Sequence, residues 1–431
     1  MSMFVGKNDL LRACKFGDVA AVSWLLKEKA VNPDVTNNDG ETPLIIAARQ
    51  GHMEIFKLLV EHGASLTKKD TNGWSPLLWA SNCGRLDIVR YLLQRNDVYI
   101  DDTSNNGATA LMWAAKSNHV DVVRALMRKD ADLFRKDQNG STAIMYACYE
   151  GHLRVVPQLL ENYKAEDLNI GNNGNTTPLM WACKGGRVDI ASCLIHRGAD
   201  VNALDSDGET ALMRAVRSGQ EELVQLLIKN HVDVNTQCKK GLSALMFASV
   251  RGNTVNVTAL MEHGAIVNLV DKDGYTALML ASQEGHVEVV KVLLKYGADL
   301  SFKTQGGLTA RDLAAKRFHN DVEDLLRTIT YDKKVEIGRQ LINDLTPTPK
   351  DFPMEYITFC TQNFHKSRRK GEGSFGVVYL AIDPEDESIE FVVKRSKIDS
   401  LTEKDLKSLK DTFEKELRVR LLFLGISFSL L

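Results

Sequence analysis

A glycine-rich run near the C-terminal end of the sequence contains the residues whose types and spacing could do chemistry. Gly371, Gly373 and Gly376 fit the pattern G-x-G-x-x-G, and Val378 follows two residues later. Glycines at this spacing can bring backbone N–H groups close to phosphate oxygens, so the chemistry indicated is phosphate binding. The motif alone leaves an alternative open, which is a glycine-rich hairpin with no nucleotide role.

Two charged residues follow this run at informative distances. The β-type residues 391–394 end in Lys394, 18 residues after Gly376, and an F-x-x-E-L pattern places Glu416 a further 22 residues on. With this setting, the segment resembles the N-terminal lobe of a eukaryotic protein kinase of the receptor-like or Pelle type. The resemblance implies ATP as cofactor, with the three glycines at the phosphates, Val378 over the adenine, Lys394 at the α- and β-phosphates, and Glu416 orienting Lys394.

The kinase resemblance covers about residues 352–420 and has departures. Lys370 stands where kinases usually have an apolar residue. No H-R-D catalytic loop and no D-F-G sequence follows, so we assign no catalytic residue and expect no phosphoryl transfer by residues 1–431. Mg²⁺ is expected only with a second lobe. Three hypotheses stay open: an interaction module with a vestigial lobe, the front of an active Ser/Thr or dual-specificity kinase, and a ligand sensor gating a pseudokinase.

The rest of the chain is built from units of 33 to 35 residues. The pattern G-x-[TS]-[PA] recurs with its hydroxyl residue at Thr42, Ser75, Thr109, Thr142, Thr177, Thr210, Ser243, Thr276 and Thr309. A degenerate unit, about residues 7–38, precedes them. Each unit contains a glycine turn, a hydroxyl residue suited to capping a short Ala-rich helix, a second apolar helix, and usually a closing glycine.

This pattern resembles the ankyrin repeat over about residues 7–329. The resemblance implies a mainly α fold, in which about ten helix-turn-helix repeats with hairpin loops stack into a curved solenoid. We expect a linker over residues 330–350 and the small α+β partial kinase domain over residues 351–431. The usual histidine of T-P-L-H is replaced in eight units, and Asp130 and His231 replace the closing glycine in two. The replacing residues are Ile45, Leu78, Met112, Met145, Met180, Met213, Met246 and Met279.

Composition narrows the possible partners and location. The net charge is −2 and no basic face stands out, so nucleic acid is not an expected partner. No run of 18 apolar residues occurs, so no membrane segment is expected. The seven cysteines have no metal-ligand spacing and fit a reducing, cytoplasmic location. Three of them stand at a small-residue position of the first helix and are expected to be structural: Cys14, Cys148 and Cys183.

A stripe of large side chains is the candidate partner-binding surface. On a helical wheel, Leu44, Ala47 and Ala48 share one side of the first helix and Ile46 lies opposite. Of the eight residues at this position, Ile46 included, five are aromatic: Trp79, Trp113, Tyr146, Trp181 and Phe247. The ankyrin resemblance places the first helices on the concave side, where these rings would contact a protein partner. The alternative is that they fill gaps between helices. Trp74, in a hairpin loop, is a further candidate.

Overall fold

The computed structural model describes residues 6–329 in full and residues 369–373, 376–383 and 386–396 as backbone alone. The chain divides into two compact units, Met1–Tyr331 and Asp332–Leu431, and each is described by itself. The predicted linker over residues 330–350 and the predicted ATP-site residue Glu416 lie outside the described residues.

Helices of the first unit alternate between two rows. One row contains α1 (Lys7–Phe16), α3 (Pro43–Gln50), α5 (Pro76–Asn82), α7 (Ala110–Lys116), α9 (Ala143–Glu150), α11 (Pro178–Lys184), α13 (Ala211–Ser218), α15 (Ala244–Arg251), α17 (Ala277–Gln283) and α19 (Ala310–Lys316). The other contains α2 (Val19–Lys27), α4 (Met53–Glu61), α6 (Leu86–Leu92), α8 (Val120–Met127), α10 (Val156–Leu160), α12 (Val188–His196), α14 (Glu221–Lys229), α16 (Thr254–Glu262) and α18 (Val287–Lys295). Helical residues 320–329 complete the last pair, and a 3-10 turn, η1 (Glu166–Asn169), precedes α11.

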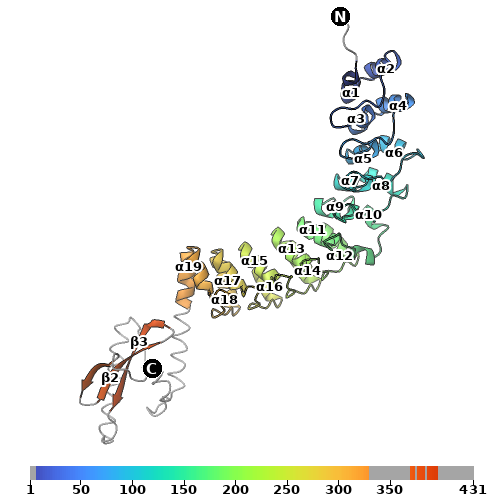
Figure 1. The fold of residues 1–431 in the computed structure, drawn as a ribbon. Coiled ribbons are helices and arrows are strands. Elements are labelled where there is room, and N and C mark those ends of the chain that lie inside the picture. The colour runs from blue at the N-terminus through green and yellow to red at the C-terminus, as the bar shows by residue number, and fades with distance from the viewer. Residues whose placement is uncertain (1–5, 330–368, 374–375, 384–385, 397–431) are drawn as a thin grey trace. The chain divides into compact units, whose positions relative to one another are not determined.

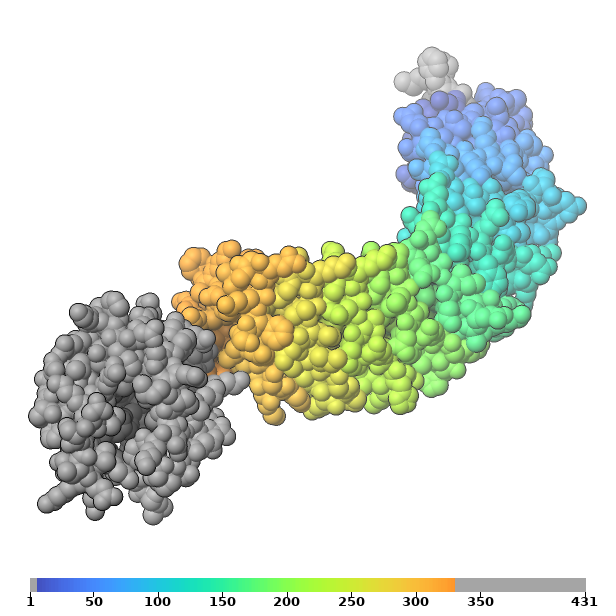
Figure 2. Space-filling view, turned by 60° about the horizontal axis from the view of Figure 1, so that its bottom comes forward, coloured from blue at the N-terminus to red at the C-terminus, as the bar shows by residue number. Residues whose placement is uncertain are grey.

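The helix pairs stack into a curved rod, with the odd-numbered helices on the inside of the curve (Figure 1). Each odd-numbered helix packs on the next, as α5 does on α7, and each also packs on its own partner. One hydrophobic cluster runs from Leu10 to Leu326 without a break, and successive repeats close up against each other at the surface (Figure 2). A single pair buries too little apolar area to be stable alone, so neighbours must cover each other. The predicted mainly α solenoid is confirmed.

The inner helices begin at the predicted hydroxyl residues. Thr42 is an example, because its Oγ1 accepts a hydrogen bond from the Ile45 backbone N–H at 3.2 Å. Such a cap satisfies a donor that the helix itself leaves free. Thr142 is the exception among the nine, since its side chain caps no backbone group and instead hydrogen-bonds to Tyr163.

The two missing closing glycines leave a local strain. At the usual position Gly63 has φ 84° and Gly264 has φ 84°. Asp130 and His231 take the same left-handed conformation, with φ 58° and 59°. A side chain costs about 1–2 kcal/mol in that region. The fold therefore holds Asp130 and His231 in a left-handed backbone conformation that residues with a side chain disfavour.

Some of the residues that replace the family histidine contact the start of their own inner helix. Met112 is buried, and its sulfur atom accepts a hydrogen bond from the Thr109 backbone N–H at 3.5 Å. Met246 and Ser243 make the same contact. Thioether sulfur is a weak acceptor, so each methionine contributes mainly through packing.

The second unit contains three described strands. β1 (Arg369–Gly373), β2 (Gly376–Asp383) and β3 (Asp386–Ser396) form an antiparallel sheet in the order β1-β2-β3. Gly373 pairs with Gly376 at the end of the first hairpin, and Val378 pairs with Lys394 across the second. No helix within the described residues is long and apolar enough to cross a membrane.

Candidate protein-binding face

The five aromatic residues predicted to contact a partner all lie on inner helices. Trp79, Trp113, Tyr146, Trp181 and Phe247 belong to α5, α7, α9, α11 and α15, and each is half-buried. Ile46, at the equivalent position of α3, is buried in the core, contrary to the placement that the helical wheel indicated. The larger rings extend beyond the core and reach the concave surface.

Trp74 joins two of these rings. Its ring centroid lies 4.5 Å from that of Trp79 and 4.3 Å from that of Trp113. The ring planes are tilted by 38° and 37°, and aromatic pairs in close contact stabilise by about 0.5–1.5 kcal/mol beyond burial alone. Trp74, the further candidate predicted from the sequence, therefore connects the rings on α5 and α7.

Several stripe residues are tied to the hairpin loop of their own repeat by an aspartate nine residues earlier. Trp79 Nε1 donates to Asp70 Oδ2 at 2.9 Å, and the Tyr146 hydroxyl donates to Asp137 Oδ2 at 2.5 Å. Burial, together with this bond to Asp137, raises the pKa of Tyr146 above its ordinary value. The hydroxyl therefore stays protonated and acts as the donor. These rings position the hairpin loops as well as lining the groove.

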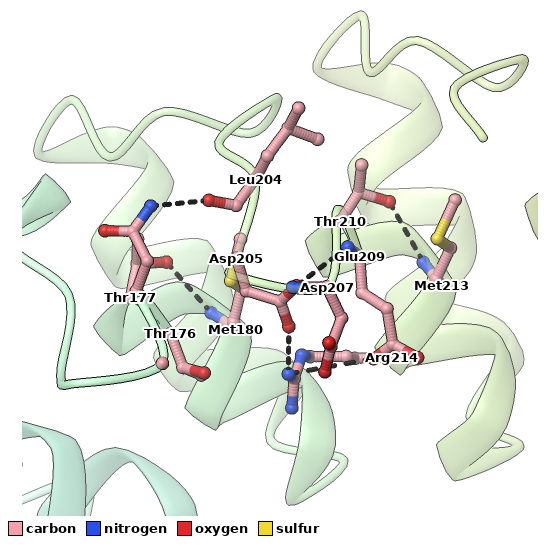
Figure 3. A network of polar contacts seen from close by, with 12 residues as sticks. Thr176, Thr177, Met180, Leu204, Asp205, Asp207, Glu209, Thr210, Met213 and Arg214 are labelled. Carbon is pink, nitrogen blue, oxygen red and sulfur yellow. Dashed lines mark hydrogen bonds and ion pairs between the residues drawn. The ribbon is translucent and has the colours of Figure 1, made fainter. Parts of the chain in front are cut away.

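Arg214 occupies the stripe position of α13 and makes the charged form of the same contact. Its guanidinium donates to Asp205 Oδ2 and lies 3.7 Å from Glu209, which also pairs with Arg217 at 2.6 Å. Asp205 Oδ1 accepts hydrogen bonds from the backbone N–H groups of Asp207 and Glu209, each at 2.8 Å (Figure 3). One carboxylate thus holds the loop with one oxygen and the inner helix with the other.

Trp113 and Trp181 lack such an acceptor. Ser104 and Asn172 stand where Asp70 and Asp137 stand in their repeats. The indole nitrogens of both tryptophans are enclosed and have no hydrogen-bond partner. An enclosed donor without a partner costs about 1–3 kcal/mol, so these two rings are held at the groove against a penalty.

Four cations lie over the rings, and each stands three residues after the stripe position of its own inner helix: Arg49 on α3, Lys116 on α7, Lys184 on α11 and Arg217 on α13. The distances from the charged group to the ring centroid are 5.0 Å for Arg49 over Trp79, 5.3 Å for Lys116 over Trp113, 5.6 Å for Lys116 over Tyr146, 4.9 Å for Lys184 over Trp181, 5.8 Å for Lys184 over Tyr149 and 5.4 Å for Arg217 over Phe247. Such cation–π contacts contribute about 0.5–1 kcal/mol at exposed sites. We call these rings and cations the ring–cation row.

The rings were predicted from the sequence, but the cations beside them were not. Positions three apart share one face of a helix, so the spacing itself would have revealed them. The aspartates nine residues before the stripe residues were also missed. That signal was present in the repeat alignment, because Asp70, Asp137 and Asp205 hold the same place in their units.

The buried cysteines belong to the core. Cys14, Cys148 and Cys183 are buried on inner helices, and burial raises the pKa of Cys14 to about 12. A thiol in that environment stays protonated at neutral pH and packs as a small apolar group. Among residues 6–329 no cluster of three or more His, Cys, Asp or Glu side chains could hold a metal ion.

The residues predicted to bind ATP are spread over the three strands. Gly371 and Gly373 lie in β1, Gly376 and Val378 in β2, and Lys394 in β3. The register pairs the backbone of Val378 directly with that of Lys394.

Comparison with known proteins finds the repeat pattern in most of the chain. The family model for ankyrin repeats in three copies matches residues 10–103, 96–172, 155–238 and 219–304. The ankyrin repeat and KH domain-containing protein mask-1 of Caenorhabditis elegans is 31% identical over 196 residues, which are 44% of this chain and 7% of that protein.

Two further relatives match shorter stretches. The ankyrin repeat and SAM domain-containing protein 6 of Mus musculus is 37% identical over 90 residues, covering 21% of this chain and 10% of that protein. The protein phosphatase 1 regulatory subunit 27 of Mus musculus is 36% identical over 77 residues, covering 18% of this chain and 50% of that protein. The chain thus spans half or less of each of these relatives. Since the family matches extend over residues 10–304 and the helix pairs stack as described, this chain belongs to the ankyrin-repeat family.

Proposed function

We propose that the repeats form a scaffold that binds a protein partner along the concave face. The observation that carries this proposal is the ring–cation row, in which large aromatic side chains remain half-exposed on successive inner helices. Aromatic residues and arginine are enriched at the centres of protein interfaces because they give much contact area for little loss of conformational freedom. The hairpin contacts of Trp79 and Tyr146 also keep this surface rigid before a partner arrives.

The test compares partner capture by the wild-type repeats with capture by a variant carrying Trp113→Leu and Trp181→Leu. Leucine keeps an apolar side chain while removing the ring, and neither indole loses a hydrogen bond. We expect the proteins captured by the wild type to be lost, with the circular dichroism spectrum unchanged. The matched control is Val255→Ala on α16, which lies in the outer row and is 51% exposed. Equal capture by the double variant would overturn the proposal.

We also propose that residues 369–396 are part of a nucleotide-binding lobe like that of a protein kinase, with ATP as its ligand. Support comes from the strand order β1-β2-β3, from the pairing of Gly373 with Gly376, and from Lys394 lying beside Val378 in register. Glycines at these positions would let backbone N–H groups approach phosphates, and a lysine on the third strand is suited to the α- and β-phosphates. A cytoplasmic location is part of the same proposal, because thiols stay reduced there.

Titration of the full chain with a fluorescent ATP analogue tests the nucleotide proposal. Lys394→Ala should weaken binding, while Lys316→Ala in the last repeat should not. Binding that is absent in the wild type would reject a nucleotide role for this segment and leave the scaffold proposal untouched.

A further inference from the structure

The two central cations of the ring–cation row lack the acidic neighbour that the outer cations have. Arg49 pairs with Glu41, and Arg217 pairs with Glu209 at 2.6 Å. Lys116 and Lys184 take part in none of the ion pairs formed within residues 6–329. The two arginines are therefore neutralised within the chain, whereas the two lysines between them have no ion-pair partner in the repeats.

The sequence explains this difference. Glu41 and Glu209 each stand just before the residue that caps their inner helix. The same position holds Ala108 before α7 and Thr176 before α11. Neither can supply a carboxylate, so the two lysines stay without an acidic partner.

The same two repeats also lack the aspartate of the hairpin loop. Ser104 and Asn172 replace it, which leaves the indole N–H groups of Trp113 and Trp181 without an acceptor. The repeat of α13, by contrast, has an acid at both positions, Asp205 and Glu209. The repeats of α7 and α11 therefore carry an uncharged residue at both of these positions.

No neighbouring carboxylate pairs with Lys116 or Lys184. The repeat between them contains the carboxylates of Asp137, which accepts the Tyr146 hydroxyl and loop N–H groups, and of Glu150, at the end of α9. Neither forms an ion pair with Lys116 or Lys184 within residues 6–329. Lys184 is exposed, and the adjoining Tyr149 is 38% exposed. The surface between the two lysines is therefore open and combines positive charge with aromatic rings.

We propose that this central part of the groove binds an extended acidic segment of the protein partner, with carboxylates at Lys116 and Lys184 and an apolar or aromatic side chain between them. The inference rests on the proposed scaffold function and names the chemistry of its partner. Lysine and carboxylate form charge-assisted contacts, and the rings offer stacking surface beside them.

The spacing of the lysines sets the spacing of the partner's acids. Lys116 ends α7 and Lys184 ends α11, with α9 packed between them. Packed helix axes are about 8–10 Å apart, so two steps span about 16–20 Å. An extended chain advances about 3.3 Å per residue, which places the two carboxylates about five or six residues apart.

The test supplies the missing acid within the chain. Thr176→Glu places a carboxylate where Glu209 neutralises Arg217, and Thr176→Gln is the control of equal size without charge. The probe is a random copolymer of glutamate and tyrosine, titrated into the repeats by calorimetry at low salt. We expect Thr176→Glu to weaken binding about tenfold relative to Thr176→Gln, which corresponds to the loss of one charge-assisted contact. Equal affinity of the two variants would overturn the proposal.

A second pair of variants covers the case in which Thr176→Glu disturbs folding. Lys184→Met should weaken binding of the copolymer. Lys316 is an exposed lysine of the last repeat, so Lys316→Met serves as the control and should leave binding unchanged. Heparin and vesicles containing phosphatidylserine serve as non-peptide polyanions. If either binds as tightly as the copolymer and with the same dependence on Lys184, the groove attracts anions in general and the acidic-segment proposal is wrong.

The two proposals can fail separately. Suppose that the variant carrying Trp113→Leu and Trp181→Leu no longer captures the partner, whereas the Thr176→Glu variant still captures it. The groove would then bind protein without using acidic residues of the partner, and only the further inference would fall. Retention by all variants would remove the scaffold proposal as well.

Discussion

Mutation of Asp205 can separate its ion pair with Arg214 from its hydrogen bonds to the loop backbone. Asp205→Asn keeps an oxygen for the backbone N–H groups of Asp207 and Glu209 and removes the charge that faces the guanidinium. The side chains of Asp205 and Arg214 are 3% and 11% exposed, so the ion pair is nearly dry. Breaking a buried pair from one side costs about 3–5 kcal/mol.

The expected loss is smaller than that, because Arg214 keeps Glu209 at 3.7 Å. We expect Asp205→Asn to lower the free energy of unfolding by about 2–3 kcal/mol. Asp271 offers a matched control, since its Oδ1 accepts the same two loop bonds, from Asp273 at 2.9 Å and Tyr275 at 2.7 Å. Nine residues after Asp271 comes Leu280, which cannot donate. Asp271→Asn should therefore cost under about 0.5 kcal/mol.

Urea unfolding followed by circular dichroism gives the free energies. Hydrogen exchange of residues 205–218 adds a local measure, because a repeat array can lose one region before the rest. Exchange in this stretch should accelerate in Asp205→Asn and stay near wild type in Asp271→Asn. If the two variants lose equal stability, the charge on Asp205 contributes nothing beyond its loop bonds and the role assigned to the aspartates is refuted.

Four further outcomes are expected. His231→Gly should raise the free energy of unfolding by about 0.5–1 kcal/mol, because glycine relieves the left-handed strain at an exposed position. A lower free energy of unfolding, measured with urea, would refute that strain. Peptide-mapped thiol labelling should modify half-buried Cys83 long before buried Cys148, whose pKa burial raises, and equal rates would contradict the assigned burial. The pKa of Asp312 is lowered: burial opposes this, but hydrogen bonds from Thr309 and nearby cations outweigh it. Its contribution is therefore present at neutral pH and lost as pH falls below about 4, so the stability difference between wild type and Asp312→Asn should vanish in acid rather than persist there. Lys394→Ala should weaken nucleotide binding without changing repeat stability, measured on one preparation, and a loss of both together would place Lys394 in folding instead.

The repeat fold could be predicted because each unit carries the same local signals. A hydroxyl residue such as Thr42 fixes where an inner helix begins, and a glycine such as Gly63 fixes where the outer helix ends. These are short-range effects, and the sequence displays the hydroxyl residue nine times and the closing glycine at Gly63, Gly198, Gly264 and Gly297. The cap prediction failed at Thr142, whose side chain bonds no backbone N–H group although α9 begins directly after it. The residue type at that position does not distinguish it from the other eight.

Only part of the candidate binding face could be predicted from the sequence. The rings stood out by type, but whether a ring faces the core or the groove depends on its neighbours, as buried Ile46 shows. The contrast between neutralised Arg217 and unpaired Lys184 required the three-dimensional pairing of Glu209. The sequence shows that cations recur at one helical position, but it does not show which of them form ion pairs within the chain.

Photocrosslinking from the groove tests the central claim most directly. A photoreactive amino acid in place of Tyr149, on the concave face of α9, should crosslink a protein partner in cells, and Trp181→Leu should abolish that product. The same amino acid in place of Val255, on outer helix α16, should give little or none. Crosslinking from position 255 that matches or exceeds that from position 149 would contradict the claim that the concave ring–cation row is where this protein binds its partner.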